Sequence, residues 1–135
     1  MSESAVHGKL ITRIEQQIRA EFADELDVLL IDRPGTKADA KPPRVGRFTP
    51  DVWAQSKRRI LLGEAKTAAD LETAHSSLQL QAFLEHVVFS PPGSRLLVAV
   101  PAFMAPRAKL IVGALARGFT PPADAWEVIG AEVVL

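Results

Sequence analysis

The middle of the chain carries an aspartate, a glutamate and a lysine whose types and spacing suit phosphodiester hydrolysis. Asp51 follows Pro50, and an acid-alanine-lysine triplet from Glu64 to Lys66 comes a short segment later. Alternate residues of a strand point to one face of a sheet, so Glu64 and Lys66 share a face. If the two segments form a hairpin, Asp51 lies beside Glu64. The three side chains then surround a space suited to a hydrated cation and a phosphate.

These groups suit a divalent cation. Hydrolysis of a phosphodiester needs charge on the phosphate to be neutralised and hydroxide to be made from water near neutral pH, and Mg²⁺ or Mn²⁺ supplies both. Such cations prefer carboxylate and carbonyl oxygens, so we predict Asp51, Glu64 and the Ala65 carbonyl as ligands. Lys66 would hold the attacking water or offset charge on the phosphate. The predicted cofactor is therefore Mg²⁺ or Mn²⁺.

The surroundings of the Glu64 triplet distinguish it from a chance occurrence. An acid-x-lysine triplet alone is a weak signal, and the chain contains a second one from Asp39 to Lys41. The second triplet runs into Pro42-Pro43, whereas the Glu64 triplet closes an apolar stretch and precedes a long helical pattern. This context places the predicted site at Glu64.

Hydrophobic periodicity and turn residues predict an α/β fold that can position these groups. Helices are expected at Val6 to Asp24, Ala69 to Val88 and Pro106 to Gly118, and strands at Asp27 to Ile31, Val45 to Ala54, Arg59 to Ala65, Arg95 to Val100 and Trp126 to Leu135. Ser2 or Ser4 could cap the first helix, and Thr67 or Asp70 the second. The second helix is a crossover, so its flanking strands should be parallel neighbours in a mixed sheet covered on both faces.

Length and composition predict one compact domain over residues 1–135. The chain has no cysteine, which excludes disulfides, thiolate nucleophiles and cysteine-based zinc sites. No apolar run is long enough to cross a membrane. The N-terminal residues Met1 to Ser4 include an acid and serines, which argues against a secretory signal. We therefore expect a cytoplasmic protein without a membrane partner.

Basic residues concentrate in one part of a chain whose formal net charge is zero. Sixteen lysines and arginines balance sixteen acids overall, but the stretch from Arg33 to Arg59 contains eight basic residues, opposed only by Asp39 and Asp51. We predict contacts to a nucleic-acid backbone from Arg33, Lys37, Lys41, Arg44 and Arg47. The alternative is a charged, solvated loop.

The motif from Pro50 to Lys66, together with the order of elements, resembles the PD-(D/E)XK nuclease superfamily of restriction endonucleases, junction resolvases and several exonucleases. The resemblance implies a restriction-endonuclease-like αβββαβ core. It also implies that Asp51 and Glu64 bind metal and that Lys66 assists the water. It names a superfamily and no particular member.

The resemblance implies two further site residues. Many members carry an acid on the first helix, and Glu15, which the helical pattern places among apolar residues, is the candidate, with Glu21 and Glu25 as rivals. Some branches carry glutamine, three residues and tyrosine after the motif. Here Gln79 has Phe83 at the tyrosine position. The alternatives are a glutamate that reaches solvent and an ordinary polar helix residue.

The histidines are not expected to bind metal. His75 and His86 are three helical turns apart, too far to share one ion, and His7 is expected at the surface.

Three functions are compatible with these patterns. The leading one is a Mg²⁺-dependent nuclease acting on DNA by structure, ends or single strands. A homodimer would double its binding surface. The second is a non-catalytic nucleic-acid-binding or interaction module of the same fold in a repair, phage or defence assembly. The third is an unrelated α/β protein with a coincidental triplet. Cleavage assays with and without metal separate them.

Overall fold

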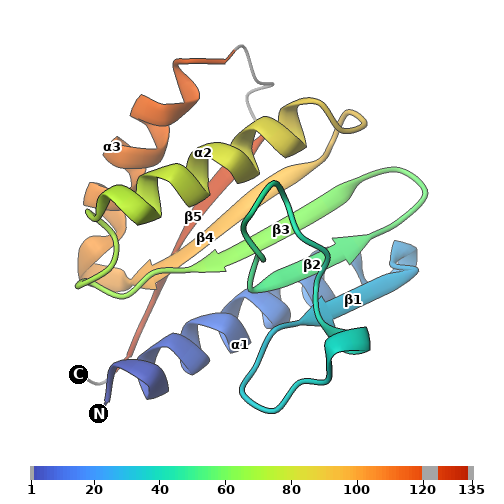
Figure 1. Cartoon of the computed structure of the whole chain (residues 1–135), viewed down its shortest axis with the longest axis horizontal. Helices are drawn as coiled ribbons and strands as arrows, with labels where there is room; N and C mark the ends of the chain where they lie inside the picture. Colours follow the sequence, from blue (N-terminus) through green and yellow to red (C-terminus); the bar gives the residue numbers. More distant parts are fainter. Residues whose placement is uncertain (1, 120–124, 134–135) are drawn as a thin grey trace.

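The computed structural model describes residues 2–119 and 125–133 and contains a five-stranded sheet between helices (Figure 1). The helices are α1 (Glu3–Phe22), α2 (Ala74–Val88) and α3 (Ala105–Ala116), and the strands are β1 (Val28–Ile31), β2 (Val52–Gln55), β3 (Ile60–Ala65), β4 (Arg95–Pro101) and β5 (Trp126–Ala131). Short 3₁₀ turns lie at Ala23–Glu25, Ala38–Ala40 and Ala102–Met104.

The sheet is mixed, and its strands lie in chain order from β1 to β5. β1, β2 and β3 form an antiparallel meander, in which Val52 pairs with Gly63. β4 runs parallel to β3 across the α2 crossover, and β5 runs parallel to β4. The predicted α/β class, the mixed sheet and the parallel β3–β4 pair are confirmed.

The helices cover opposite faces of the sheet, as expected. The apolar stripe of α1, which includes Ile14 and Ile18, packs with one face of the sheet. α2 and α3 pack on the other face, against side chains such as Leu62 and Val98. Figure 1 shows α1 on one side of the sheet and the other two helices on the opposite side. Along β3, Leu61 and Ala65 therefore face α1, and Leu62 and Glu64 face α2.

The predicted strand from Val45 to Ala54 is wrong at its start, because β2 begins only at Val52. Val45 and Phe48 instead form an isolated bridge around Gly46, whose φ of 62° suits a tight turn. Pro50 has no backbone N–H to donate to a ladder. Asp51 therefore directly precedes the strand.

Two helix starts also differ from expectation. α2 begins at Ala74, with Thr73 as its N-cap accepting from the Ser76 N–H at 3.0 Å. The predicted caps Thr67 and Asp70 lie in the preceding turn, where the Asp70 N–H donates to the Thr67 carbonyl. α1 begins earlier than expected and is capped by Ser2, as predicted.

The C-terminal elements are shorter than predicted: α3 ends at Ala116 and β5 at Ala131. The last two residues of the predicted final strand lie outside the described residues. None of the helices in the described ranges combines the length and the apolar character needed to cross a bilayer.

Candidate active site

The antiparallel register of β2 and β3 brings Asp51 and Glu64 into contact. Val52 pairs with Gly63, so the same register sets Asp51 opposite Glu64. The Asp51 N–H donates to Glu64 Oε1 at 3.2 Å, and the Ala65 N–H donates to Asp51 Oδ2 at 2.8 Å. The two carboxyl groups lie on neighbouring segments at one end of the sheet, as the spacing predicted.

Lys66 joins this pair from the residue after β3. Its N–H donates to the Ala99 carbonyl at 2.9 Å, which fixes the backbone against β4. Its Nζ lies 3.6 Å from Glu64 Oε2 and donates to Gln79 Oε1 on α2. The structure thus brings together Asp51, Glu64, Lys66 and Gln79, all of which the sequence had singled out.

The environment of the two acids favours a single negative charge. The Glu64 side chain is 4% exposed and that of Lys66 is 7% exposed. Burial, followed by the Asp51 charge, raises the pKa of Glu64 well above its usual value. Burial alone would also raise the pKa of Asp51, but hydrogen bonds from His7, the Glu64 carboxyl and the Ala65 N–H hold that pKa below its usual value. A proton on Glu64 therefore relieves repulsion between the pair.

His7 belongs to the site, although the sequence had suggested a surface position. Its Nε2 lies 3.3 Å from Asp51 Oδ2, and its side chain is 36% exposed. This hydrogen bond is the main cause that raises the pKa of His7. One turn earlier on α1, Glu3 accepts from the Thr67 hydroxyl. The apolar stripe of α1 continues from Ile11 to Val6, and the position of His7 one turn before Ile11 on that stripe is the signal that could have found this residue.

A hollow of about 240 Å³ opens beside these groups. It is lined by His7, Thr49, Asp51, Glu64, Ala65, Lys66, Asp70, Thr73, His75 and Gln79. Thr49 lies in the segment before β2, and Asp70, Thr73 and His75 lie in the turn before α2 and its first turn. No motif links these four residues in sequence: the segment before β2 brings Thr49 to the hollow, and the crossover from β3 to α2 brings the other three.

The donor set at this hollow fits a hard cation with few protein ligands. Asp51 and Glu64 supply carboxylate oxygens, and the Ala65 N–H points to Asp51. In an extended strand the carbonyl of a residue points to the same strand edge as its N–H, so the Ala65 carbonyl is available there. Across the described residues, no cluster of three or more histidine, aspartate or glutamate side chains is placed to hold a metal ion. Mg²⁺ commonly binds through one or two carboxylates and keeps several waters.

Glu15 does not line the hollow. Its carboxylate lies 3.0 Å from Arg19 Nε and 3.4 Å from Arg33 Nη2. The side chain is 24% exposed, so the charge is partly buried and neutralised by arginines. From α1, His7 occupies the place beside Asp51 that the resemblance had assigned to Glu15.

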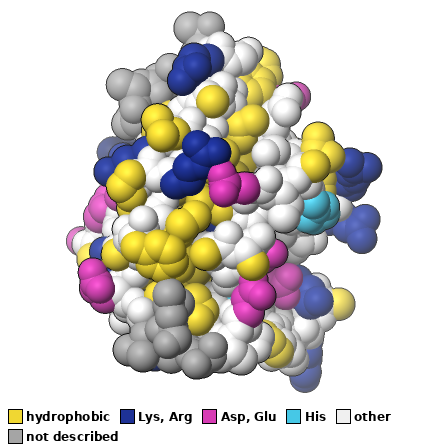
Figure 2. Space-filling view, turned by 90° about the vertical axis from the view of Figure 1, so that its left-hand side faces the viewer, with side chains coloured by type: hydrophobic (Ala, Val, Ile, Leu, Met, Phe, Trp, Pro, Cys, Tyr) yellow, Lys and Arg dark blue, Asp and Glu magenta, His cyan; other side chains and the backbone are white. Residues whose placement is uncertain are grey.

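The predicted nucleic-acid-binding residues divide into two groups. Arg33 packs along α1, where it also donates to Thr12 Oγ1 at 3.1 Å, and Lys41 lies 3.8 Å from Asp32. Lys37, Arg44 and Arg47 are exposed, and the Arg47 guanidinium lies 5.3 Å from the centre of the Phe48 ring. Figure 2 shows one face of the molecule, on which acidic, basic and apolar side chains mix and Lys and Arg side chains stand out along the right-hand edge.

No family model, curated protein or solved structure matches this chain. The chemistry of the site therefore follows from its own groups. The buried carboxyl group of Glu64 and the partly buried one of Asp51 can hold a cation in place of a proton. A buried ammonium group, oriented by Gln79, can hold an anion or a water beside them.

Proposed function

We propose that the chain is a metal-dependent nuclease of the PD-(D/E)XK type that hydrolyses phosphodiester bonds in DNA. The observation that carries the proposal is the contact of Asp51 with Glu64 at a hollow that also holds Lys66 Nζ. Burying a glutamate and a lysine beside an aspartate is costly for a fold. Such a cluster in a cleft is typical of a functional site.

Each side chain has a distinct role in the proposal. Asp51 and Glu64 hold the cation, with the Ala65 carbonyl as a third oxygen donor. The bound Mg²⁺ or Mn²⁺ supplies Lewis-acid activation of the phosphate and of the attacking water. Lys66 positions that water or offsets charge on the phosphate, while Gln79 orients the ammonium group.

His7 is a positioning residue in this scheme. It donates to Asp51 Oδ2 when that nitrogen carries a proton, and the Ala65 N–H donates to the same oxygen. These contacts fix the orientation of the carboxylate while its other oxygen can serve the cation.

The order of elements supports a restriction-endonuclease-like core for this proposal. The αβββαβ order is present from α1 to β4, with α3 and β5 following it. The acid before β2 and the acid-x-lysine triplet at the end of β3 occupy the positions that the resemblance implies. Exposed Lys37, Arg44 and Arg47 would contact phosphates without reading sequence.

A cleavage panel tests the proposal. Single-stranded, duplex and branched DNA are incubated with the protein in Mg²⁺, Mn²⁺ or EDTA. We expect cleavage that requires the metal and that falls about 100- to 10,000-fold in Lys66→Ala. Lys109→Ala, an exposed lysine on α3, is the matched control and should cut at the wild-type rate.

The outcomes separate the three functions. Metal-dependent cleavage that is lost in Lys66→Ala supports the enzyme. Binding without cleavage favours a non-catalytic module. The absence of both binding and cleavage contradicts the enzyme and the module alike. A homodimer would double the DNA-contacting surface, and light scattering of the purified protein tests for it.

A further inference from the structure

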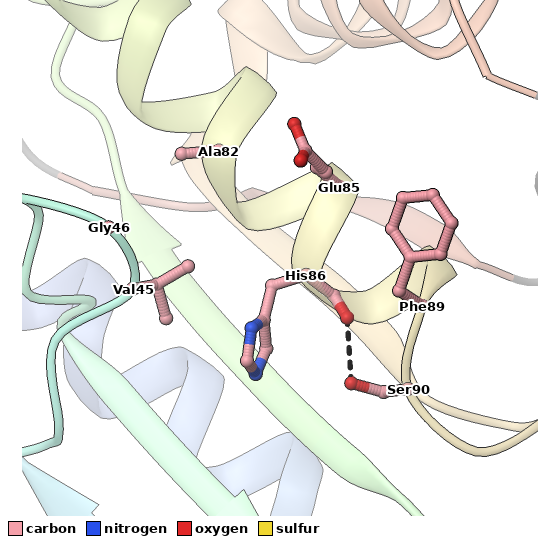
Figure 3. Close-up of a pocket in the computed structure, with 7 residues that line it drawn as sticks. All are labelled: Val45, Gly46, Ala82, Glu85, His86, Phe89 and Ser90. Atoms are coloured by element: carbon pink, nitrogen blue, oxygen red, sulfur yellow. Dashed lines mark hydrogen bonds between the residues drawn. The ribbon is translucent and has the colours of Figure 1, made fainter.

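A second and larger hollow, of about 520 Å³, lies between the turn at Val45 and Gly46 and the C-terminal half of α2. Figure 3 shows the imidazole of His86 beside Val45, whereas the side chains of Glu85 and Phe89 extend away from Val45. This volume lies within the range of small-molecule binding sites. The nuclease chemistry proposed above does not use any of these residues.

The second hollow follows the candidate active site along one side of α2. His75 and Gln79 line the first hollow, and Ala82 and His86 line the second. Residues at such spacings share a helix face. Between the hollows, Phe48 packs edge-on against both His75 and Phe83, with ring centres 5.6 and 6.4 Å apart. The helix rise from Gln79 to Phe89 is about 15 Å, which a few nucleotides of extended strand can span.

The groups around the second hollow suit a nucleobase better than a phosphate. Phe89 is 79% exposed, so its ring is free to stack on a flat partner. The His86 ring lies 5.7 Å from the Trp53 ring, centre to centre, and its Nε2 is enclosed, so this side chain gives the hollow a wall. Glu85 adds an exposed carboxylate, which repels phosphate but accepts hydrogen bonds from the amino or imino groups of a base.

Positive charge lies beside the second hollow. Arg44 and Arg47 flank the Val45–Gly46 turn in sequence, and both are exposed. They can contact the phosphates on either side of a base, while the base itself lies against α2. This pairing of basic side chains with an aromatic surface is how proteins bind single-stranded nucleic acid.

We propose that the hollow between the Val45–Gly46 turn and α2 binds one base of the substrate strand, stacked on Phe89, a few nucleotides from the bond that is cut. The proposal rests on the nuclease function and gives that site a preference for single-stranded or frayed DNA. The exposed Glu85 carboxylate supplies a hydrogen-bond acceptor for the base edge, and the His86 ring, which packs against Trp53, forms part of the wall of the hollow.

The test is an abasic-site scan. A fluorescein-labelled single strand of about twelve nucleotides is made with one base removed at each position in turn, and binding is followed by fluorescence anisotropy in EDTA. We expect one abasic position to weaken binding about tenfold, the effect of losing one stacked base. Phe89→Ala should weaken binding of the intact strand about tenfold and lose the sensitivity to that position.

Leu110→Ala is the matched control, because Leu110 is an exposed apolar residue on α3, 62% accessible. It should bind every strand as the wild type does. Equal binding of all abasic strands by the wild type overturns the proposal, as does an unchanged positional effect in Phe89→Ala. If the wild type also cuts DNA in a Lys66-dependent manner, the nuclease function survives that result. If the wild type neither binds nor cuts any strand, both proposals fall.

Discussion

The contact between Asp51 and Glu64 couples the stability of the protein to its proposed chemistry. Glu64 is buried and adjacent to Asp51, and its pKa is raised by burial and then by that charge. The folded protein therefore holds the Glu64 proton more tightly than the unfolded chain does. This contribution to stability is present at acid pH and is lost as pH rises through the folded-state pKa.

Glu64→Gln should therefore raise the melting temperature in EDTA at pH 8, because an amide removes the buried charge next to Asp51 while keeping a hydrogen-bond acceptor. At pH 5 the difference from wild type should shrink, since the raised pKa of Glu64 favours its protonated form as the pH falls. Thermal unfolding followed by circular dichroism measures both. Glu132→Gln, an exposed acid, is the control and should leave the melting temperature unchanged at either pH. A variant less stable than wild type at pH 8 would contradict the assigned repulsion.

Mg²⁺ should raise the melting temperature of the wild type more than that of Glu64→Gln. A cation that binds only the folded protein raises its melting temperature, by an amount that grows with cation concentration. We expect this rise in the wild type at pH 8 and little of it in Glu64→Gln, which lacks one carboxylate ligand. Titration by differential scanning fluorimetry measures the effect. An equal rise in the two proteins would place the cation elsewhere.

His7 makes a second pH-dependent contribution. Its pKa is raised mainly by the hydrogen bond to Asp51, so its stabilising effect is present below its unfolded pKa and is lost as pH rises through the folded value. His7→Ala should therefore lower the melting temperature more at pH 6 than at pH 9. Thermal unfolding at the two pH values, with His75→Ala as the control from the same hollow, tests this. Equal decreases in melting temperature at the two pH values would show that the hydrogen bond between His7 and Asp51 is not charge-assisted.

At the scale of elements, α1 crosses β3 very closely at Gly63. A Cβ built on Gly63 would lie 2.7 Å from Ile14 Cγ2 and 3.0 Å from Val52 Cβ. Ile14 is fully buried, so it has little room to move. The absence of a side chain at Gly63 is therefore what lets the helix lie against the residue before Glu64.

Gly63→Ala should destabilise the protein by about 1–3 kcal/mol, the usual cost of overpacking a core. Gly8→Ala is the matched control, because Gly8 lies within α1 and a Cβ there meets nothing within 4 Å. Alanine favours a helix over glycine, so Gly8→Ala should stabilise by up to about 1 kcal/mol. Urea unfolding of both variants measures the change in the free energy of unfolding, which should be a decrease for Gly63→Ala and an increase for Gly8→Ala. A neutral Gly63→Ala would mean that α1 can shift away from the sheet.

The sequence predicted the elements that depend on local pattern. The apolar stripe of α1, the apolar run of β4 and the crossover of α2 were each recognisable from spacing alone. The start of β2 was misplaced because Phe48 suits a strand, whereas Gly46 and Pro50 impose a turn and a missing donor. Propensity is a weak guide where a turn residue decides.

Within the site, local sequence patterns again predicted some residues, whereas contacts between distant parts of the chain were not predicted. Glu64 and Lys66 were placed by strand periodicity, and Asp51 by the hairpin register. His7 was missed because its hydrogen bond with Asp51 joins residues far apart in the chain. Glu15 was misassigned because helical periodicity gives a direction but does not show that Arg33 would reach across to pair with it.

At the scale of the whole molecule, a chain with no formal net charge has several exposed basic residues in the segment before β2. Formal charges cancel over the sequence, while Lys37, Arg44 and Arg47 are exposed before β2. Local charge of this kind governs encounter with a polyanion more than net charge does. Salt dependence of binding therefore reports how many of these residues meet phosphates.

Replacing both Lys37 and Arg44 by alanine should weaken DNA binding and reduce the slope of log affinity against log salt by about two, one for each phosphate that is no longer neutralised. The exposed residues Lys109 and Arg117, on α3 and directly after it, form the control pair and should leave the slope unchanged. Anisotropy titrations over a range of NaCl concentrations give the slopes. An unchanged slope in the variant lacking Lys37 and Arg44 would indicate that the segment is a solvated loop that does not contact DNA.

The first two turns of α1 supply both Glu3, which bonds Thr67, and His7, which bonds Asp51. Helix ends open locally at a free energy well below that of global unfolding. Warming should consequently fray this end and release Asp51 while the sheet is still intact. Heat inactivation would then precede the loss of tertiary structure, and amide exchange would be fastest at the start of the same helix.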